Sequence, residues 1–376
     1  MKIVCDNRIP FIKGVFEPFA EVVYLPGKDT GPSDVKDADA VITRTRTICN
    51  KALLEGSKVK VIATATIGYD HIDTAWCEAS GIAWSNAPGC NSASVKQYVT
   101  SVLCTLARRL SLDFESLTLG VVGVGNVGSK VAAAAKALGM RVLLNDPPRA
   151  RKEGPEGFTG LEDIMREADI ITLHVPLSKE GPDATWHLFD AGRIGRLRKD
   201  QILINSSRGP VVDNAALREA LSGRRIRAAV LDTWEGEPEI DTGLQALLEL
   251  GTPHIAGYSA DGKANGTAAS VRTVARQLGL PLTGWQPSDI PSPAQSLVFE
   301  IDAAGKTRQQ VLCEAVLHTY DVSQDDEALR RSPELFEKLR GDYPVRREFT
   351  AFSLRLLNGN EAEASALSEL GFKLIG

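Results

Sequence analysis

The sequence predicts an α/β protein with two parallel-sheet domains in series and a small α+β domain at the C-terminus. Over roughly the first 280 residues, short runs rich in β-branched residues alternate with helix-favouring segments, which is typical of parallel strands joined by crossover helices. A glycine-rich turn near residue 123 follows the first strand of a second such series. A proline-rich stretch at 284–293 then separates a more charged segment that runs to residue 376.

The first series begins at the N-terminus. Met1–Asp6 is a predicted strand that ends in an acid, and three later runs are predicted strands: Val22–Leu25, Ala40–Ile42 and Val59–Ala63. Each is short and apolar, as expected for strands buried on both faces of a sheet. A long helix is predicted from about 94 to 109, before the second series begins.

The second series has its own regular order. A strand at Leu117–Val122 precedes a helix at Ser129–Leu138. The further predicted strands are Arg141–Asn145, Ile170–His174, Ile202–Asn205, Ala228–Leu231 and Pro253–Ile255. Two complete α/β units in one chain favour two domains that each bury a core of their own.

Composition narrows the class of protein. The 376 residues carry 43 Lys and Arg against 48 Asp and Glu, a net charge of −5, whereas nucleic-acid binders usually carry a basic face. No apolar run approaches the roughly 20 residues of a membrane helix. The six cysteines are scattered without a CxxC pair, so we expect free, mostly buried thiols, no metal site and a cytoplasmic protein.

The glycine-rich turn Gly123–Gly128 reads Gly-Val-Gly-Asn-Val-Gly and lies between a predicted strand and a predicted helix. Glycines at this spacing allow a tight turn and close approach of a pyrophosphate to the helix N-terminus. Asp146 ends the next strand, 18 positions after Gly128, where an acid hydrogen-bonds ribose hydroxyls and repels a 2′-phosphate. This favours NAD over NADP, although the nearby cations Arg149, Arg151 and Lys152 weaken the preference.

Three clusters of polar residues follow later strands, at 205–213, 232–238 and 252–258. Functional groups of open α/β sheets gather at the carboxyl ends of strands. Oxidation of an alcohol by hydride transfer needs a base for the hydroxyl proton, a cation for a substrate carboxylate and an acid that orients the base. His254, Arg208 and Glu237 supply one of each.

Other polar residues have weaker interpretations. We interpret His187 and His318 as structural or surface residues, and His174 as a residue that at most lines the cofactor side. Thr43–Thr47 ends a predicted strand with two arginines and three threonines, which suits a phosphate monoester or a carboxylate.

Over roughly residues 1–280 the chain resembles the D-isomer-specific 2-hydroxyacid dehydrogenases. The resemblance is carried by the glycine-rich turn, by Asn-Ser-Ser-Arg-Gly at 205–209, by Leu-Asp-Thr-Trp-Glu-Gly-Glu-Pro at 231–238 and by Thr-Pro-His at 252–254. The family's catalytic set of Arg, Glu and His corresponds to Arg208, Glu237 and His254. The resemblance implies a flavodoxin-like substrate-binding domain (1–95 and 257–283), a Rossmann-like NAD-binding domain (96–256) and a C-terminal domain (287–376).

One branch of the family is especially similar. The segments that indicate it are 63–73, 86–91, 254–263 and a tail of about ninety residues containing Tyr-Pro-Val-Arg-Arg-Glu-Phe at 343–349. The resemblance implies oxidation of 4-phospho-D-erythronate to 2-oxo-3-hydroxy-4-phosphobutanoate with NAD, in pyridoxal 5′-phosphate (vitamin B6) biosynthesis. It also implies a homodimer formed through the C-terminal domain.

The same resemblance implies further site residues. Arg208 and three others would contact substrate: Thr45, Thr66 and Tyr258. The NAD site would be lined by Gly123, Gly125, Asn126, Val127, Gly128, Asp146, Val175, Ser206, Ser207, Arg208, Asp232 and Gly257. Val175 stands where threonine is common, and Tyr69 where a smaller residue is frequent, so these two positions depart from the family pattern.

Two alternatives stay open at this point. Another enzyme of the family, acting on 3-phosphoglycerate, glyoxylate or hydroxypyruvate, would share the catalytic residues, because fold and catalytic set do not determine the substrate. A dinucleotide-sensing binding module on the same scaffold would keep the glycine-rich turn without turnover. Substrate competition distinguishes the first alternative, and turnover with any hydroxy acid distinguishes the second.

Overall fold

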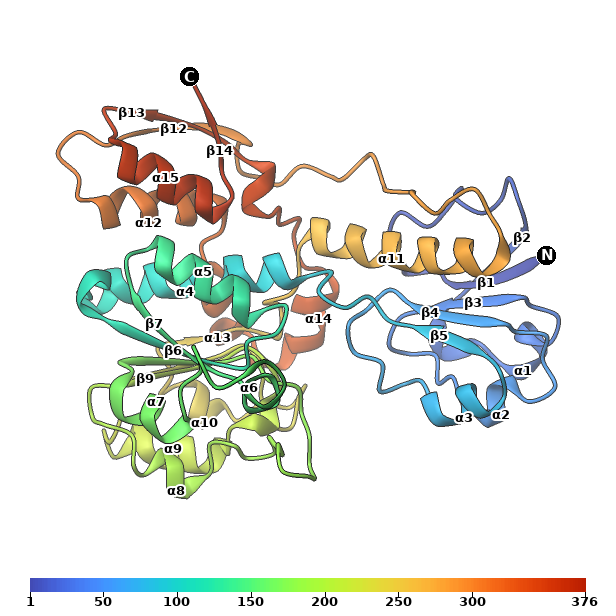
Figure 1. Cartoon of the computed structure of the whole chain (residues 1–376), viewed down its shortest axis with the longest axis horizontal. Helices are drawn as coiled ribbons and strands as arrows, with labels where there is room; N and C mark the ends of the chain where they lie inside the picture. The colour runs from blue at the N-terminus through green and yellow to red at the C-terminus, as the bar shows by residue number, and fades with distance from the viewer. The chain divides into compact units, whose positions relative to one another are not determined.

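The computed structural model describes residues 1–376, and its strands form three parallel sheets (Figure 1). The chain divides into two units. The first contains residues 1–91 and 259–291, and the second contains residues 92–258 and 292–376. The predicted α/β class is confirmed, since in each unit helices connect parallel strands.

The first unit contains a five-stranded sheet. In spatial order its strands are β2 (Glu21–Leu25), β1 (Lys2–Asp6), β3 (Ala40–Thr43), β4 (Val61–Thr64) and β5 (Ala83–Ser85). One face packs against the long helix α11 (Ala260–Leu278). The short helices on the other side are α1 (Pro32–Val35), α2 (Lys51–Leu54) and α3 (Thr74–Ala79) (Figure 1). Since β3 and β4 are buried throughout, only the loops at their ends can carry polar function.

The second unit contains a six-stranded sheet. In spatial order its strands are β11 (Leu250–Gly251), β10 (Ala228–Leu231), β9 (Ile202–Asn205), β8 (Ile170–Leu173), β6 (Thr118–Val122) and β7 (Arg141–Asn145). The chain leaves β6 for β7 on one side and returns to β8 on the other. This reversal makes the carboxyl ends of β6 and β8 the topological switch point, where open α/β sheets bind ligands.

Helices cover both faces of this sheet (Figure 1). On one face lie α4 (Ser92–Leu110) and α5 (Gly128–Ala137). Those associated with the other face are α7 (Leu161–Glu167), α8 (Ala191–Ile194), α9 (Asn214–Ser222) and α10 (Thr242–Gln245). The remaining helix, α6 (Pro147–Glu153), follows β7 directly. Alternate residues of β9 and β10 face the two cores, as strand geometry requires.

The other predicted strands lie within two residues of the observed bounds, but the one at Pro253–Ile255 is wrong. The strand in this region is β11 at Leu250–Gly251, and the chain leaves the sheet after it. Pro253 has no backbone N–H to donate to a ladder. His254 has a φ of 55°, in the left-handed region that strands do not use. The apolar content of this segment reflects a buried loop rather than a strand.

The C-terminal segment forms a third, smaller sheet, in which β13 (Ser353–Leu357) lies between β12 (Val298–Asp302) and β14 (Lys373–Ile375). Its helices are α12 (Arg308–Thr319), α13 (Ser323–Arg331), α14 (Phe336–Gly341) and α15 (Glu361–Leu370). Although the segment has its own sheet, it belongs to the same unit as residues 92–258. The predicted three-domain division therefore stays a prediction.

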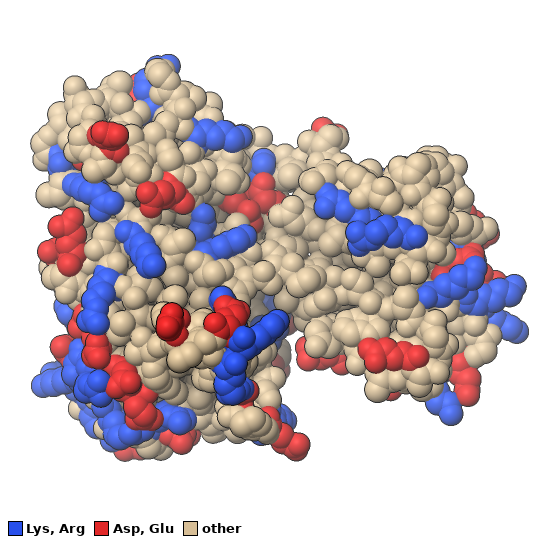
Figure 2. Space-filling view, viewed as in Figure 1, with Lys and Arg blue, Asp and Glu red and all other residues tan.

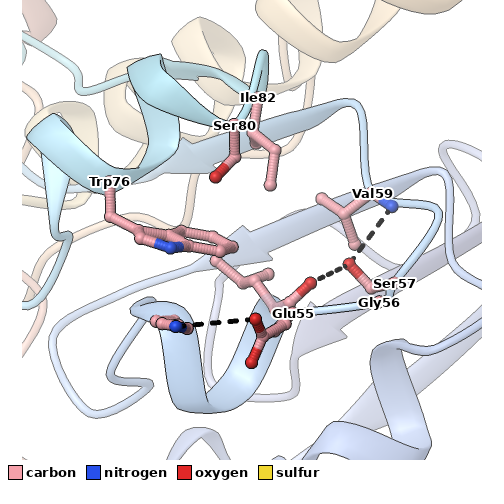
Figure 3. Close-up of a pocket in the computed structure, with 9 residues that line it drawn as sticks. Glu55, Gly56, Ser57, Val59, Trp76, Ser80 and Ile82 are labelled. Atoms are coloured by element: carbon pink, nitrogen blue, oxygen red, sulfur yellow. Dashed lines mark hydrogen bonds and ion pairs between the residues drawn. The ribbon is translucent and has the colours of Figure 1, made fainter.

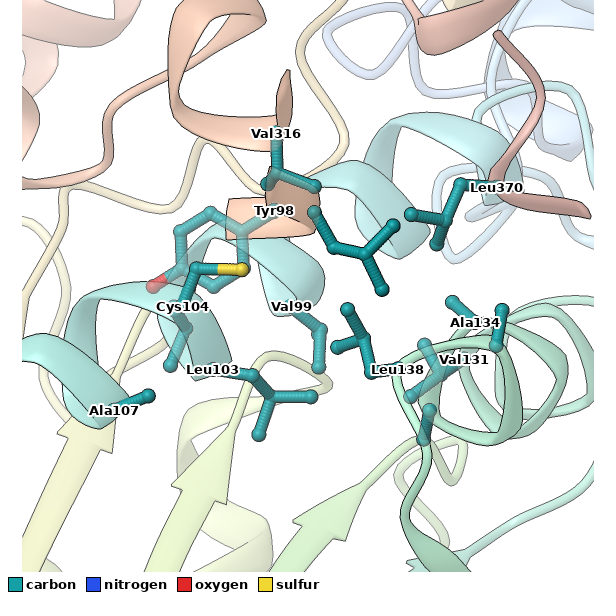
Figure 4. Close-up of a cluster of buried hydrophobic side chains, with 14 of the residues drawn as sticks. Tyr98, Val99, Leu103, Cys104, Ala107, Val131, Ala134, Leu138, Val316 and Leu370 are labelled. Carbon is teal, nitrogen blue, oxygen red and sulfur yellow. The ribbon is translucent and has the colours of Figure 1, made fainter. Parts of the chain in front are cut away.

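The physical reason for this grouping is a shared core. Figure 4 shows side chains of α4 and α5 packed against Val316 of α12 and Leu370 of α15. Hydrogen bonds reinforce the contact: Gln97 Nε2 donates to Thr319 Oγ1 (3.1 Å), and Ser101 Oγ donates to the Tyr320 carbonyl (2.8 Å). Helix α4, which lies on the six-stranded sheet, is thus covered by the C-terminal segment.

The surface and the thiols agree with the composition. All six cysteines are free, and four of them are buried. In the face shown in Figure 2, acidic and basic side chains are interspersed on both units, and several form ion pairs such as Arg198–Asp169. Among the helices, none combines the length and apolar character that a membrane crossing requires.

Candidate active site

The glycine-rich turn joins β6 to α5 at the switch point of the sheet. Gly123 has a φ of 86°, and a Cβ there would lie 2.6 Å from the His174 carbonyl oxygen. A Cβ on Gly128 would collide with the Gly123 carbonyl. Gly125 faces open space, since a Cβ there would have no other atom within 4 Å. The turn is therefore a tight backbone cradle with an accessible outer surface, which fits a pyrophosphate at a helix N-terminus.

Asp146 lies at the end of β7 and is tied to this turn. Its Oδ2 accepts the Val124 N–H (2.9 Å), and its Oδ1 accepts the Arg149 N–H at the start of α6 (3.1 Å). Arg149 is in turn engaged by Glu153, with Nη2 2.7 Å from Oε2. Arg151 forms an ion pair with Asp183. Because two nearby cations already have acidic partners, the carboxylate of Asp146 dominates this end of the strand, as NAD binding requires.

We expect Asp146→Asn to weaken the preference for NAD. Loss of the charge removes charge-assisted hydrogen bonds to ribose hydroxyls and the repulsion of a 2′-phosphate, so the ratio of kcat/KM with NAD to that with NADP should fall about tenfold or more. Asp190→Asn is the matched control, because Asp190 also caps a helix by accepting a backbone N–H, from Arg193 (2.8 Å). An unchanged ratio in Asp146→Asn would contradict the assignment.

The turn after β9 supplies a second group of polar atoms. Asn205 organises it, since its Oδ1 accepts from Ser207 N and Oγ (3.1 and 2.7 Å) and its Nδ2 donates to the Arg208 carbonyl (2.9 Å). Ser206 Oγ is buried with no hydrogen-bond partner. A buried hydroxyl without a partner is costly, and a bound dinucleotide would supply one. The residues at this switch point therefore fit NAD.

Glu237 and His254 are joined by a short hydrogen bond. His254 Nδ1 lies 2.7 Å from Glu237 Oε2, and Glu237 Oε1 accepts the Trp234 N–H (2.7 Å). An ionised carboxylate only accepts hydrogen bonds, so Nδ1 carries the proton and Nε2 of the neutral ring is a free base. The His254 side chain is 32% exposed, and its Nε2 has no hydrogen-bond partner within the chain. The imidazole is thus oriented at one nitrogen and accessible at the other.

A second pair, His187 with Glu235, shows why pairing alone does not indicate catalysis. His187 Nε2 lies 2.7 Å from Glu235 Oε1, and its φ of 46° is also in the left-handed region. Its other nitrogen, Nδ1, lies 3.9 Å from Asp213 Oδ2, and its ring stacks on Trp186. The 3.9 Å separation is beyond hydrogen-bond distance, so His187, like His254, has one imidazole nitrogen bonded to a glutamate and one without a hydrogen bond. The structural role of His187 therefore stays a prediction from the sequence.

The loop that carries His254 is held by the buried Asp232, which the sequence analysis assigned only to the NAD site. Asp232 Oδ1 accepts from Thr252 Oγ1 (2.7 Å) and the Ile255 N–H (2.8 Å), and Oδ2 accepts the Ala256 N–H (3.0 Å). Burial raises the pKa of Asp232, while these hydrogen bonds and nearby His254 act in the opposite direction. Tyr98 of α4 donates to Thr252 (2.8 Å) and extends the network. Loop positions 255 and 256 are therefore anchored from the sheet side.

Arg208 follows the same turn as Ser207. One guanidinium nitrogen, Nη1, donates to the Ser207 carbonyl (2.8 Å). The side chain is half-buried and forms no ion pair, unlike the arginines that pair with acids at the surface. A partly desolvated guanidinium without an acid is suited to bind an incoming carboxylate in bidentate fashion.

His174 lies beside the glycine-rich turn and does not qualify as an acid–base group. Burial lowers the pKa of His174 to about 3, so the imidazole stays neutral at physiological pH. Its Nε2 is 3.0 Å from Thr172 Oγ1, and its Nδ1 is buried without a partner. Val175, the next residue, would contact a Cβ on Gly123 at 2.9 Å. These residues form the wall of the cradle on the β8 side.

In the first unit, the predicted substrate residues Thr45 and Thr66 follow adjacent strands. Thr64 Oγ1 donates to the Arg44 carbonyl (3.1 Å) and lies 2.7 Å from Thr66 Oγ1, which joins the two loops. Thr45 is exposed, and Thr66 is half-buried. The carboxyl ends of β3 and β4 thus bring these two hydroxyl-bearing loops together, as the parallel order predicts.

A cavity of about 340 Å³ in the first unit lies at the opposite ends of these strands (Figure 3). Its walls come from α2 and α3 and from the connections that follow them to β4 and β5, and they include Ser57, Trp76 and Ile82. These connections precede β4 and β5, so they lie at the amino ends of the strands. The cavity contains none of the predicted site residues, and we do not assign it to the active site.

Comparison with known proteins gives the family. Residues 93–256 match the NAD binding domain of D-isomer specific 2-hydroxyacid dehydrogenases, and residues 294–371 match a domain of unknown function, DUF3410. An erythronate-4-phosphate dehydrogenase of Bacteroides thetaiotaomicron is 52% identical over 94% of this chain and 99% of its own length. The chain belongs to the erythronate-4-phosphate dehydrogenase family. An Edwardsiella ictaluri member is 44% identical over 99% of both chains.

Solved structures agree with this family. D-lactate dehydrogenase of Aquifex aeolicus, determined with NAD and lactic acid, has a TM-score of 0.59 and 25% identity, over 74% of this chain and 96% of its own. A Thermus thermophilus protein reaches a TM-score of 0.64 at 27% identity, over 78% of this chain and 100% of its own. Membership of the erythronate-4-phosphate dehydrogenase family makes the chain an NAD-dependent oxidoreductase of the 2-hydroxyacid dehydrogenase type.

Proposed function

We propose that this enzyme oxidises 4-phospho-D-erythronate to 2-oxo-3-hydroxy-4-phosphobutanoate in pyridoxal 5′-phosphate biosynthesis. The similarity to erythronate-4-phosphate dehydrogenases extends over nearly the whole chain, including the C-terminal segment. The structural observation that supports the chemistry is the Glu237–His254 pair, which orients one nitrogen and leaves the other as a free base.

The roles of the residues follow from their chemistry. When NAD is bound, its nicotinamide ring accepts the hydride. His254 takes the hydroxyl proton of the substrate at Nε2, and Glu237 stabilises the resulting imidazolium through Nδ1–H. Arg208 binds the carboxylate next to the reacting carbon and polarises the oxygen that becomes a ketone. Thr45, Thr66 and Tyr258 contact the rest of the substrate.

We assign the NAD site to the switch point of the six-stranded sheet. Glycines 123, 125 and 128, with Asn126 and Val127, form the pyrophosphate cradle at the start of α5. Asp146 holds the ribose. The other lining residues are Val175, Ser206, Ser207, Arg208, Asp232 and Gly257.

We expect Glu237→Gln to lower kcat by on the order of 10²-fold or more. The Trp234 N–H holds the amide oxygen, so the amide NH2 faces Nδ1 and selects the tautomer that carries its proton at Nε2, where the base is needed. The affinity for NADH, measured by fluorescence titration, should change little. Glu235→Gln is the control, since it breaks the His187 pair without touching His254. Equal losses of kcat in both variants would show that the effect is structural.

The assay that tests the function follows NADH absorbance with 4-phospho-D-erythronate and with 3-phosphoglycerate, in the presence of a ketone trap. A strong preference in kcat/KM for 4-phospho-D-erythronate supports the proposal. Preference for 3-phosphoglycerate would retain the chemistry and overturn the substrate. Absence of turnover with either, repeated with a 2-oxo acid to reoxidise a tightly held cofactor, would favour the dinucleotide-sensing alternative.

The enzyme acts as a cytoplasmic homodimer, with the C-terminal sheet at the interface. The free cysteines agree with a reducing compartment. On the C-terminal sheet, Val298, Leu357 and Ile375 are exposed at 59%, 36% and 37%, and exposed apolar side chains of this kind mark association surfaces. Sedimentation equilibrium tests this assignment, and a mass of one chain at assay concentrations would overturn it.

A further inference from the structure

The loop His254–Tyr258 is held by residues of the C-terminal segment as well as by Asp232. Arg346 lies between α14 and β13 and is only 4% exposed. Its Nη2 donates to the carbonyls of Ile255 (3.2 Å) and Ala256 (2.6 Å). Asp232 accepts the N–H groups of the same two residues. Both sides of this short stretch of backbone are therefore engaged by buried charged groups.

Two tyrosine rings and an acid surround the Arg346 guanidinium. The guanidinium lies over the Tyr320 ring, 4.4 Å from its centroid, and 5.7 Å from that of Tyr343. Both tyrosine hydroxyls donate to Asp325 Oδ2, at 2.7 and 2.8 Å. Burying a charge costs free energy unless polar partners compensate it. Nε and Nη1 of Arg346 are buried without a hydrogen-bond partner, so the two tyrosine rings and the two carbonyls next to His254 are the polar surroundings that offset part of this cost.

The end of the loop makes further contacts with the same segment. The Tyr258 ring packs edge-on against Tyr343, with centroids 5.8 Å apart, and Arg340 lies 5.7 Å from the Tyr258 centroid. Tyr258 is a proposed substrate residue. Residues 340–346 therefore contact the loop at two places, near each of its functional side chains.

We propose that Arg346 is a positioning residue for the dehydrogenase reaction, acting through the carbonyls of Ile255 and Ala256 on the loop that carries His254. The left-handed backbone of His254, with its φ of 55°, persists only where the surroundings hold it. Asp232 and Arg346 together provide that restraint. This inference rests on the proposed role of His254, and it gives the C-terminal segment a catalytic contribution within its own chain.

The experiment compares Arg346→Met with Arg330→Met. Arg330 of α13 is the comparison, because it donates to the carbonyls of Gln245 (3.0 Å) and Leu248 (2.8 Å) and so also joins the C-terminal segment to residues 92–258. Unlike Arg346 it is exposed, and it forms an ion pair with Asp326. It does not touch the loop 254–258. For each variant the measurements are kcat, KM, NADH affinity, Tm and the mass in solution.

We expect Arg346→Met to lower kcat at least about tenfold, since small displacements of a reacting group are costly, with NADH affinity and mass unchanged. Arg330→Met should lower Tm and keep kcat within about twofold. Wild-type kcat in Arg346→Met, or equal losses of kcat in the two arginine variants, would overturn the proposal. If Arg346→Met does not fold, Arg346→Lys is compared with Arg330→Lys by the same criteria.

His254→Ala in the same assay separates the two hypotheses. If His254→Ala retains turnover, the proposed catalytic role fails, whatever Arg346→Met does. If His254→Ala is inactive while Arg346→Met has wild-type kcat, only the positioning role of Arg346 fails.

Discussion

His254→Ala should lower kcat by about 10²- to 10⁴-fold, the range that a positioned general base contributes. The variant loses the nitrogen that accepts the hydroxyl proton, and Glu237 is left without its partner at 2.7 Å. NADH affinity should remain nearly intact, because the cradle at the glycine-rich turn does not involve this imidazole. The measurements are steady-state kcat with saturating substrates and fluorescence titration with NADH.

His187→Ala is an unusually close control for this variant. It removes an imidazole with the same bond length to a glutamate and the same left-handed backbone. Because we interpret His187 as structural, its loss should reduce stability through the broken Glu235 hydrogen bond and have little effect on kcat. A near-wild-type kcat for His254→Ala would show that another group takes the proton, and the assignment of the base would be wrong.

Arg208→Lys should lose most of the activity, with kcat/KM reduced by roughly tenfold to a hundredfold. A lysine keeps the charge but cannot present two parallel N–H donors to a carboxylate, and hydrogen bonds to charged groups contribute about 1.5–3 kcal/mol each. The loss should be greater for substrates than for NADH binding, because the substitution leaves the glycine-rich turn, to which we assign the cofactor, unchanged.

Arg198→Lys provides the comparison, since Arg198 is a half-buried arginine that, unlike Arg208, pairs with acids, Asp169 and Asp200. That substitution should leave kcat/KM within about twofold, as expected for solvent-accessible ion pairs. If Arg208→Lys were equally mild, the bidentate role would be excluded. A loss confined to Tm would instead indicate that Arg208 serves only to hold the turn through the Ser207 carbonyl.

Much of this protein follows from local sequence pattern. The strands at Arg141–Asn145, Ile202–Asn205 and Ala228–Leu231 have the predicted bounds, because buried strands are continuous apolar runs ended by polar residues. The glycine-rich turn is equally local, since its conformation depends on residues that lack a Cβ. The strand predicted at Pro253–Ile255 was wrong, because a buried loop and a buried strand both consist of apolar residues and the sequence does not distinguish them.

The pairing of Glu237 with His254 could be expected from the motifs, and the structure adds the geometry that leaves Nε2 accessible. The roles of Asp232, Thr252 and Arg346 could not be predicted in the same way. The hydrogen-bond partners described above lie 20 to 154 positions away in the sequence, and nothing in a buried polar residue's neighbours along the chain identifies the group it will bond.

The sequence by itself thus determined the α/β class and the dinucleotide turn, and it supplied the candidates for the reacting residues, because each depends on short-range spacing and on the chemistry of single side chains. Only the tertiary structure showed which parts of the protein the C-terminal segment contacts. It shares a core with α4 and α5 and places Arg346 against the backbone beside His254. A buried arginine needs compensating partners from several elements at once, so its position is specified by packing across the whole unit.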